Sequence, residues 1–189
     1  MNVSTALVPG SIGAIAGHNG TGLAETFLNC DCIVICDTSG SMHTRDGRGG
    51  RSRYDVELAE MARLQANLPG KIAILAFSNE VMFCPGGQPL DYGGGTNLAK
   101  ALEFARVADV PGMRFIVISD GCPDSEQDAL AAARRYRAQI DTIFVGPEDD
   151  ILGGRAFLER LAAASGGRSV TADRAQELAA RVERLLLAD

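Results

Sequence analysis

The sequence predicts an α/β fold of the Rossmann-like, doubly wound kind, with a mostly parallel central sheet, one antiparallel edge strand and helices on both faces. The runs "IVIC", "IAILAF" and "FIVIS" are continuously apolar, as strands buried on both faces require. Segments with apolar residues at helical spacing separate these runs, and such crossovers join parallel strands. The chain has 189 residues, of which 46% are hydrophobic, and this suits one domain with a substantial core.

The individual elements follow from periodicity and from turn residues. Strands are expected at residues 31–36, 71–77, 80–84, 113–119, 141–145 and 168–171. The strand at 80–84 follows the short turn Ser78-Asn79, so it should pair antiparallel with the strand before it at an edge of the sheet. Helices are expected at residues 54–68, 97–107, 125–139, 156–164 and 174–187. Pro69-Gly70 ends the first of them, and Ser125 is a suitable N-cap for the third.

The first 29 residues are expected to form an N-terminal arm outside the main domain, which spans residues 30–189. Residues 1–20 are rich in Gly, Ser and Ala and should be irregular, whereas Thr21–Leu28 should form a short helix. The sequence leaves open whether the arm packs on the sheet, covers a helix or serves an assembly.

Charge and composition bear on the class of partner and on the location of the chain. The net charge of −6 gives no general reason to expect binding to nucleic acid or to an anionic membrane.

The start "MNVSTALVPG" lacks the basic and apolar regions of a signal peptide, and an odd number of cysteines favours a reducing compartment, so a cytoplasmic location is expected. Cys30, Cys32 and Cys36 do not have the spacing of a zinc site and are expected to be small buried thiols.

Polar residues follow two of the expected strands where each strand ends. Asp37 follows the first long apolar run and Asp120 follows "FIVIS". In the common doubly wound strand order 3-2-1-4-5-6 these two strands are neighbours, at the point where ligands bind. The glycine-rich loop that ends in "GGGTN" reaches the same edge and carries Thr96.

The stretch "CDTSGSM" adds two hydroxyl groups to this edge. Gly40 allows the backbone to turn so that Ser39 and Ser41 face the same point. Hard oxygen ligands of this kind suit Mg²⁺, Mn²⁺ or Ca²⁺, and the candidate ligands are Asp37, Ser39, Ser41, Thr96 and Asp120. Two carboxylates only balance the charge of a divalent cation, so an open coordination position would attract an acidic oxygen from a partner.

This pattern, D-x-S-x-S followed by T and D, resembles the metal-ion-dependent adhesion site of von Willebrand factor type A (VWA) domains. The resemblance covers residues 30–187 and all five positions occur in order. It implies a Rossmann-like domain that binds a divalent cation, with a partner Asp or Glu completing the coordination. Asp37 would be the anchor, the serines and Thr96 would act directly or through water, and Asp120 often through water. The lack of a signal fits the intracellular members, which often act in multiprotein assemblies, some with AAA+ ATPases.

Two features depart from the family pattern, namely the N-terminal arm and the longer loop at residues 44–53. That loop carries Arg45, Arg48, Arg51 and Arg53, and we expect a solvated loop, with a grip on an acidic partner or a phosphate as the alternative. His43 is expected to lie at the rim without a chemical role.

Two other functions stay open besides a protein-binding module. One is a metal-dependent phosphoryl-transfer or hydrolytic enzyme that uses Asp37 and Asp120. We expect no enzyme, because the chain lacks a G-x-S-x-G motif and has Ser39 where haloacid dehalogenase phosphatases need a second Asp as general acid. The other is a structural subunit whose metal only holds the loops.

Overall fold

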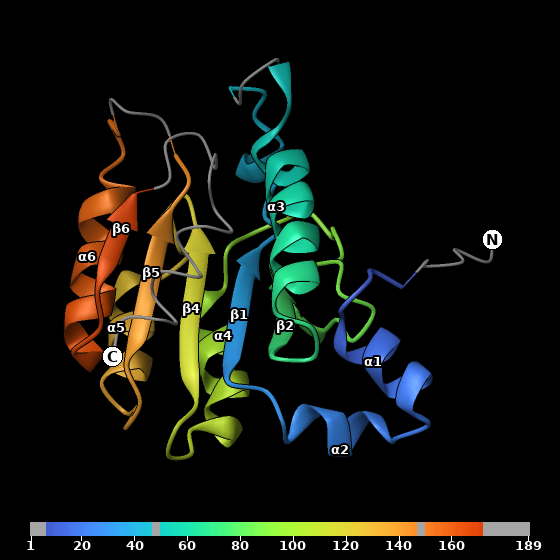
Figure 1. Cartoon of the computed structure of the whole chain (residues 1–189). Coiled ribbons are helices and arrows are strands. Elements are labelled where there is room, and N and C mark those ends of the chain that lie inside the picture. Colours follow the sequence, from blue (N-terminus) through green and yellow to red (C-terminus); the bar gives the residue numbers. More distant parts are fainter. Residues whose placement is uncertain (1–6, 47–49, 147–149, 172–189) are drawn as a thin grey trace.

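The computed structural model describes residues 7–46, 50–146 and 150–171 and contains one six-stranded sheet in the order β3-β2-β1-β4-β5-β6 (Figure 1). The strands are β1 (Cys32–Asp37), β2 (Ile72–Phe77), β3 (Val81–Phe83), β4 (Arg114–Ser119), β5 (Ile140–Phe144) and β6 (Ser169–Thr171). Neighbouring strands are parallel except β2 and β3, which are antiparallel. The predicted fold class and strand order are therefore confirmed.

Helices cover both faces of the sheet. Figure 1 shows α3 in front of the sheet and α4 and α5 behind it. The α-helices are α1 (Ile12–Asn19), α2 (Leu23–Phe27), α3 (Arg53–Asn67), α4 (Leu98–Ala105), α5 (Glu126–Ala133) and α6 (Gly154–Ser165). Two short 3₁₀ helices, η1 (Gly40–His43) and η3 (Arg106–Ala108), follow β1 and α4.

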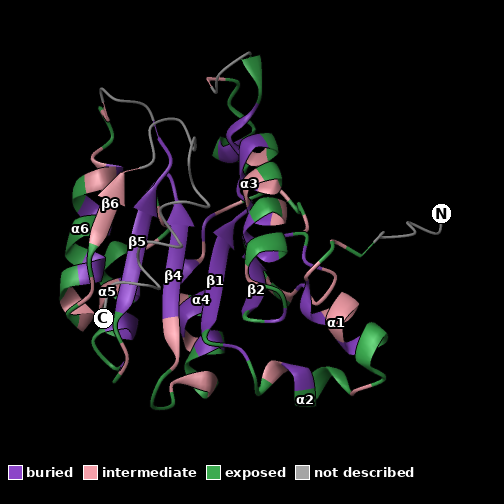
Figure 2. Cartoon of the chain, viewed as in Figure 1, coloured by how far each residue is buried: buried purple, intermediate pink, exposed green. Residues whose placement is uncertain are grey.

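The sheet divides the core into two layers, because successive side chains of a strand point to opposite faces. Ile33 and Ile35 of β1 belong to the layer that contains α4, α5 and α6. Cys32, Val34 and Cys36 of the same strand belong to the layer that contains α3. Every residue of β1, β2 and β5 is buried, as Figure 2 shows in purple. This agrees with the apolar runs of β1 and β2, whereas β5 also buries Asp141 and Thr142. All five cysteines are free, and Cys30, Cys32 and Cys36 are buried as predicted.

The arm is more regular than expected, because residues 12–19 form α1 instead of irregular chain. Ser11 caps this helix by accepting a hydrogen bond from the Ala14 N–H. Gly13 N donates to the Pro85 carbonyl and Gly70 N donates to the Gly10 carbonyl, so α1 lies against the end of α3 and the loop after β3. Its Gly- and Ala-rich sequence has a weak apolar pattern, which is why periodicity did not reveal it.

The helix expected over residues 125–139 ends at Ala133. The reason is a tertiary contact, because both carboxylate oxygens of Asp109 accept backbone hydrogen bonds, from Arg137 N at 2.7 Å and from Ala138 N at 2.9 Å. These N–H groups are therefore bound outside any helix. The helix expected at residues 174–187 lies outside the described residues. Within the described parts of the chain, no helix is both long enough and apolar enough to cross a bilayer.

Candidate metal centre

The candidate ligands lie at the carboxyl ends of β1 and β4, which are neighbours in the sheet. Asp37 is the last residue of β1 and is 0% exposed, and Asp120 directly follows β4 and is 6% exposed. The chain leaves β1 in one direction toward β2 and enters β4 on its other side, so the loops diverge here and leave room for a ligand. The fold thus brings the two predicted carboxylates to one edge.

Asp37 is held by a donor at each of its carboxylate oxygens. Ser39 N donates to Oδ1 at 2.9 Å, and the Ser119 hydroxyl donates to Oδ2 at 2.6 Å. Burial raises the pKa of Asp37 to about 6 in the metal-free protein, and the Asp120 charge adds to the rise, whereas the hydrogen bonds from Ser119 and Ser39 oppose it. Each oxygen keeps a further lone pair, so Asp37 is a fixed and buried ligand candidate.

The two serines meet in the turn that follows β1. Their hydroxyl oxygens lie 3.1 Å apart, with Ser39 buried and Ser41 exposed. The turn is η1, a single 3₁₀ segment, which brings residues 39 and 41 to the same side. Two hydroxyl groups therefore converge beside Asp37, as the spacing S-x-S predicted.

Thr96 lies in the glycine-rich loop, which is tied to the turn of the serines. Gly40 N donates to the Gly94 carbonyl at 3.2 Å. Thr96 is 7% exposed, and it exchanges two hydrogen bonds with Asp124, because Thr96 N donates to Asp124 Oδ1 at 2.9 Å and Asp124 N donates to the Thr96 carbonyl at 3.0 Å. Asp124 is thus a supporting residue that the motif did not indicate.

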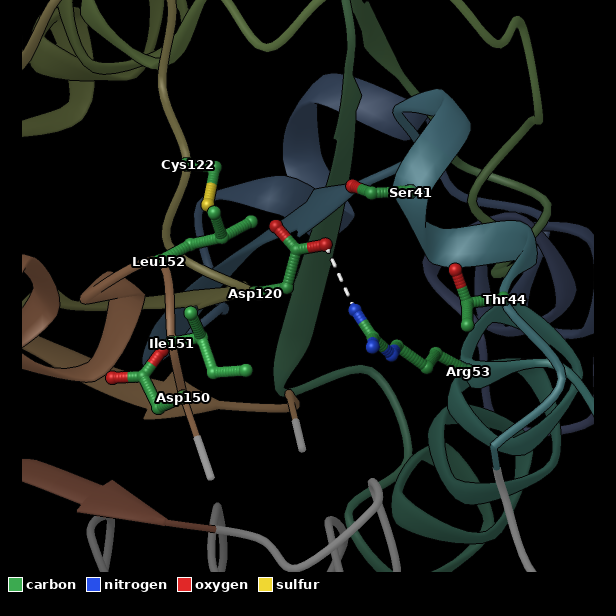
Figure 3. Close-up of a pocket in the computed structure, with 8 residues that line it drawn as sticks. All are labelled: Ser41, Thr44, Arg53, Asp120, Cys122, Asp150, Ile151 and Leu152. Carbon is green, nitrogen blue, oxygen red and sulfur yellow. Dashed lines mark hydrogen bonds and ion pairs between the residues drawn. The ribbon is translucent and has the colours of Figure 1, made fainter. Parts of the chain in front are cut away.

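Asp120 has two oxygens in different states. Oδ2 accepts a hydrogen bond from Arg53 Nη1 at 3.0 Å, whereas Oδ1 is buried and has no hydrogen-bond partner among the described residues. The carboxylate lines a cavity of about 570 Å³, shown in Figure 3, together with Ser41, Thr44, Arg53, Cys122, Asp150, Ile151 and Leu152. An orphaned buried oxygen at a cavity wall needs a partner, and a cation is one that fits.

Comparisons with known proteins find similarity in structure alone. No protein-family model and no curated protein matches the chain in sequence. A solved aerotolerance-related membrane protein from Bacteroides fragilis superposes with a TM-score of 0.65 at 17% identity, over 82% of this chain and 97% of that one. A von Willebrand factor type A protein from Catenulispora acidiphila gives a TM-score of 0.60 at 16% identity, over 82% and 41% of the two chains. The chain has the VWA fold.

A third structure with this fold was solved with a metal. The manganese-loaded TRAP protein of Plasmodium vivax matches with a TM-score of 0.52 at 14% identity, over 83% of this chain and 74% of that one. In the present chain the candidate ligands contain only two carboxylates. Accordingly, no group of three or more His, Cys, Asp or Glu residues with metal-site geometry occurs in the described ranges. A cation bound between these two carboxylates would also need hydroxyl oxygens as ligands, and the residues present fit Mg²⁺, Mn²⁺ or Ca²⁺ better than a soft metal.

Arg53 corrects the prediction that residues 44–53 form a solvated loop. Arg53 is the first residue of α3 and is 7% exposed. Its Nε and Nη2 donate to the Asp46 carboxylate at 3.0 and 2.6 Å while Nη1 reaches Asp120. Burial alone would lower the pKa of Arg53, but the hydrogen bonds and charges of Asp46 and Asp120 raise it overall, so the guanidinium stays charged. Arg45 and Arg51 are exposed as expected, and Arg48 lies outside the described residues.

The signal that places Arg53 is the capping box that begins α3. Ser52 accepts from Asp55 N at 3.0 Å, and the Asp55 carboxylate accepts from Ser52 N, so the helix starts at residue 53 and points its first side chain at the site. His43 forms a half-exposed contact with Asp91, at 3.1 Å from Nε2 to Oδ2, and lies outside the ligand set.

Proposed function

We propose that this chain is a divalent-metal-dependent protein–protein interaction module whose metal binds an Asp or Glu of the partner. The observation that carries the proposal is the state of the Asp120 carboxylate, which lines a cavity: one oxygen is paired to Arg53, and the other is buried without a hydrogen-bond partner in the described part of the chain. A VWA neighbour solved with manganese supports a divalent ion in such a fold.

Each predicted ligand has a role that its surroundings support. Asp37 would anchor the cation, because the backbone and Ser119 already fix its position. Ser39, Ser41 and Thr96 would supply neutral oxygens, and Asp120 would contribute Oδ1, directly or through water. A bound Mg²⁺, Mn²⁺ or Ca²⁺ would supply a positive charge with an open position for a carboxylate oxygen.

The arrangement favours binding over catalysis. A phosphoryl-transfer enzyme would need Asp37 as an exposed nucleophile, and this side chain is 0% exposed with both oxygens hydrogen-bonded. We therefore propose that the chain is not an enzyme. A cytoplasmic location and a partner assembly that includes an AAA+ ATPase are further parts of the proposal, and they rest on the sequence resemblance alone.

We also propose that residues 1–29 form an arm that precedes a VWA domain at 30–189. The hydrogen bonds between α1 and the loop after β3 suggest that the arm supports the domain from outside the sheet.

The test is calorimetric titration of chelator-stripped protein with Mg²⁺, Mn²⁺ and Ca²⁺. Wild type should show saturable binding that Asp37→Ala abolishes, and the exposed control Asp128→Asn should bind as wild type does. A pull-down with and without chelator then looks for the acidic partner. The proposal fails if no ion binds and the pull-down is insensitive to chelator.

The same variants separate the other functions. An enzyme would turn over generic phosphoesters and lose that activity in Asp37→Asn. A structural subunit would lose stability in Asp37→Ala while it kept its partner.

A further inference from the structure

The centre contains a built-in positive charge besides any metal. Arg53 is nearly buried and donates to Asp120 Oδ2 from one side and to Asp46 from the other. Figure 3 shows its guanidinium pointing at Asp120 across the cavity from Ile151 and Asp150. Through Arg53, the predicted ligand Asp120 is joined to Asp46 in the loop before α3.

The charges around the cavity can be summed from the described residues. Asp120 and Arg53 line the cavity and carry opposite charges, while Asp46, which pairs with Arg53, and Asp37, at the end of the neighbouring strand, add two negative charges beside it. Asp150 also lines the cavity, but its carboxylate accepts hydrogen bonds from Gly154 N and Arg155 N at the start of α6, which compensate part of its charge. Cys122 adds a thiol at the wall. Arg53 is thus the one basic side chain among the residues that line this cavity in the described chain.

We propose that Arg53 is an internal counter-cation of the metal centre. It neutralises Asp120 while no metal is bound, competes with the divalent cation for that carboxylate, and makes the loaded site more attractive to an anionic partner. The inference rests on the proposed function, because it concerns the same site and the same class of partner.

Two buried carboxylates close together repel each other, and a cation between or beside them relieves the repulsion. Arg53 supplies that relief permanently. The free energy of binding of a divalent ion is therefore less favourable than it would be beside two unpaired carboxylates. Once the ion is bound, the positive charge of Arg53 remains and attracts the partner's carboxylate.

A residue that merely positions Asp120 would behave in the opposite way. Loss of a positioning residue weakens cation binding, whereas loss of a counter-cation tightens it. Asp46 offers a second test. Asp46→Asn leaves the positive charge of Arg53 less compensated, so it should weaken cation binding. Opposite effects of the two substitutions are therefore the signature of electrostatic competition.

The experiment compares Arg53→Gln, Arg53→Lys and Asp46→Asn with wild type by calorimetric titration of the metal-free proteins with Mn²⁺. The matched control is Arg51→Gln, which removes the same charge from an exposed side chain two positions away. Arg53→Gln should bind Mn²⁺ at least about tenfold more tightly, because the repulsion between a unit charge and a nearby divalent ion at an effective dielectric constant of roughly 20 exceeds this, and Asp46 offsets only part of it. Arg53→Lys should lie near wild type, Asp46→Asn should bind several-fold more weakly, and Arg51→Gln should not differ.

Two further readouts test the other parts of the inference. The melting temperature of the metal-free protein should fall in Arg53→Gln but not in Arg51→Gln. Sodium acetate, compared with sodium chloride at equal ionic strength, should tighten Mn²⁺ binding to wild type and do so less in Arg53→Gln.

The outcomes separate this inference from the proposed function. If wild type binds Mn²⁺ and Arg53→Gln binds it no more tightly, only the counter-cation role is overturned. If Arg53→Gln binds Mn²⁺ where wild type shows no binding, the competition is supported directly. If neither binds, the inference fails, and the pull-down with and without chelator decides whether the proposed function fails as well. Should Arg53→Gln not fold, Arg53→Met takes its place, since it keeps much of the apolar stem without the charge, and weaker or unchanged Mn²⁺ binding in that variant would overturn the inference.

Discussion

Ser119→Ala should make cation binding depend more steeply on pH. Ser119 is buried at 1% exposure, donates to Asp37 Oδ2 at 2.6 Å and accepts from Gly121 N at 3.0 Å. The hydroxyl stabilises the charged carboxylate, so its removal raises the pKa of Asp37 further above the value of about 6 that burial produces. A divalent ion must then compete with a proton on Asp37 up to a higher pH than in wild type.

The magnitude follows from the hydrogen bond. A bond to a charged group contributes about 1.5–3 kcal/mol, and if roughly half of this distinguishes the ionised from the protonated form, the pKa rises by about one unit, to about 7. At about pH 8 both proteins are ionised and should bind alike, whereas at about pH 6 the ionised fraction falls from about one half to about one tenth, and apparent affinity falls about fivefold. The free energy of unfolding should drop by about 2–4 kcal/mol, because Asp37 Oδ2 and the Gly121 N–H both lose a partner.

The assay is Mn²⁺ titration of both proteins across this pH range, with urea unfolding of the metal-free forms. Thr38→Val is the control, since the Thr38 hydroxyl donates to the Phe77 carbonyl at 3.0 Å, is equally buried and does not contact Asp37. It should cost about 1 kcal/mol of stability and leave the pH dependence unchanged. A wild-type-to-Ser119→Ala affinity ratio that stays constant with pH would refute the reasoning.

Three further perturbations address other features. Burial holds the pKa of Glu57 well above its ordinary value, so the wild-type protein loses free energy of unfolding as the pH rises from the pKa of the unfolded chain toward that raised pKa. Glu57→Gln should therefore gain stability relative to wild type between about pH 5 and about pH 8 in urea unfolding. A difference that stays constant with pH would contradict this. Gly121→Ala should cost about 3 kcal/mol or more, because φ is +81° and the new Cβ would lie 2.2 Å from a backbone oxygen of α6. Gly112→Ala, with φ of +88° and open space, should cost only about 1 kcal/mol by the same measurement. Asp124→Ala should weaken Mn²⁺ binding through the threonine loop it anchors, whereas Asp109→Ala, which also removes a carboxylate that accepts backbone N–H groups, should lower stability without changing the Mn²⁺ affinity.

The sheet and its ends could be predicted because burial on both faces leaves a simple pattern. Continuous apolar runs identified β1, β2 and β4, and each predicted boundary agrees with the structure within one residue. The strand order then placed Asp37 and Asp120 at one edge, since the carboxyl ends of parallel neighbours must meet. This part of the site needed only periodicity and topology.

The supporting residues could not be predicted, because their roles arise from contacts between distant parts of the chain. Ser119 is the last position of a strand that the sequence predicts to be buried. Nothing in "FIVISDG" shows that its hydroxyl faces Asp37 rather than solvent. Arg53 lies in an arginine-rich stretch that is typical of solvated loops, and only the start of α3 turns it inward. The hydrogen bonds to Asp109 likewise shorten α5 in a way that helix propensity does not reveal.

The edges of the sheet have a consequence for behaviour at high concentration. Within the described residues the sheet is bounded by β3 and β6, which have three residues each, while the long strands lie between them. Short edge strands offer few free backbone groups for pairing with another chain, so they suppress fibrillar association and domain swapping through the sheet. Association in concentrated preparations should therefore involve the loops at the strand ends, where a bridging cation and a neighbouring molecule's carboxylate would meet.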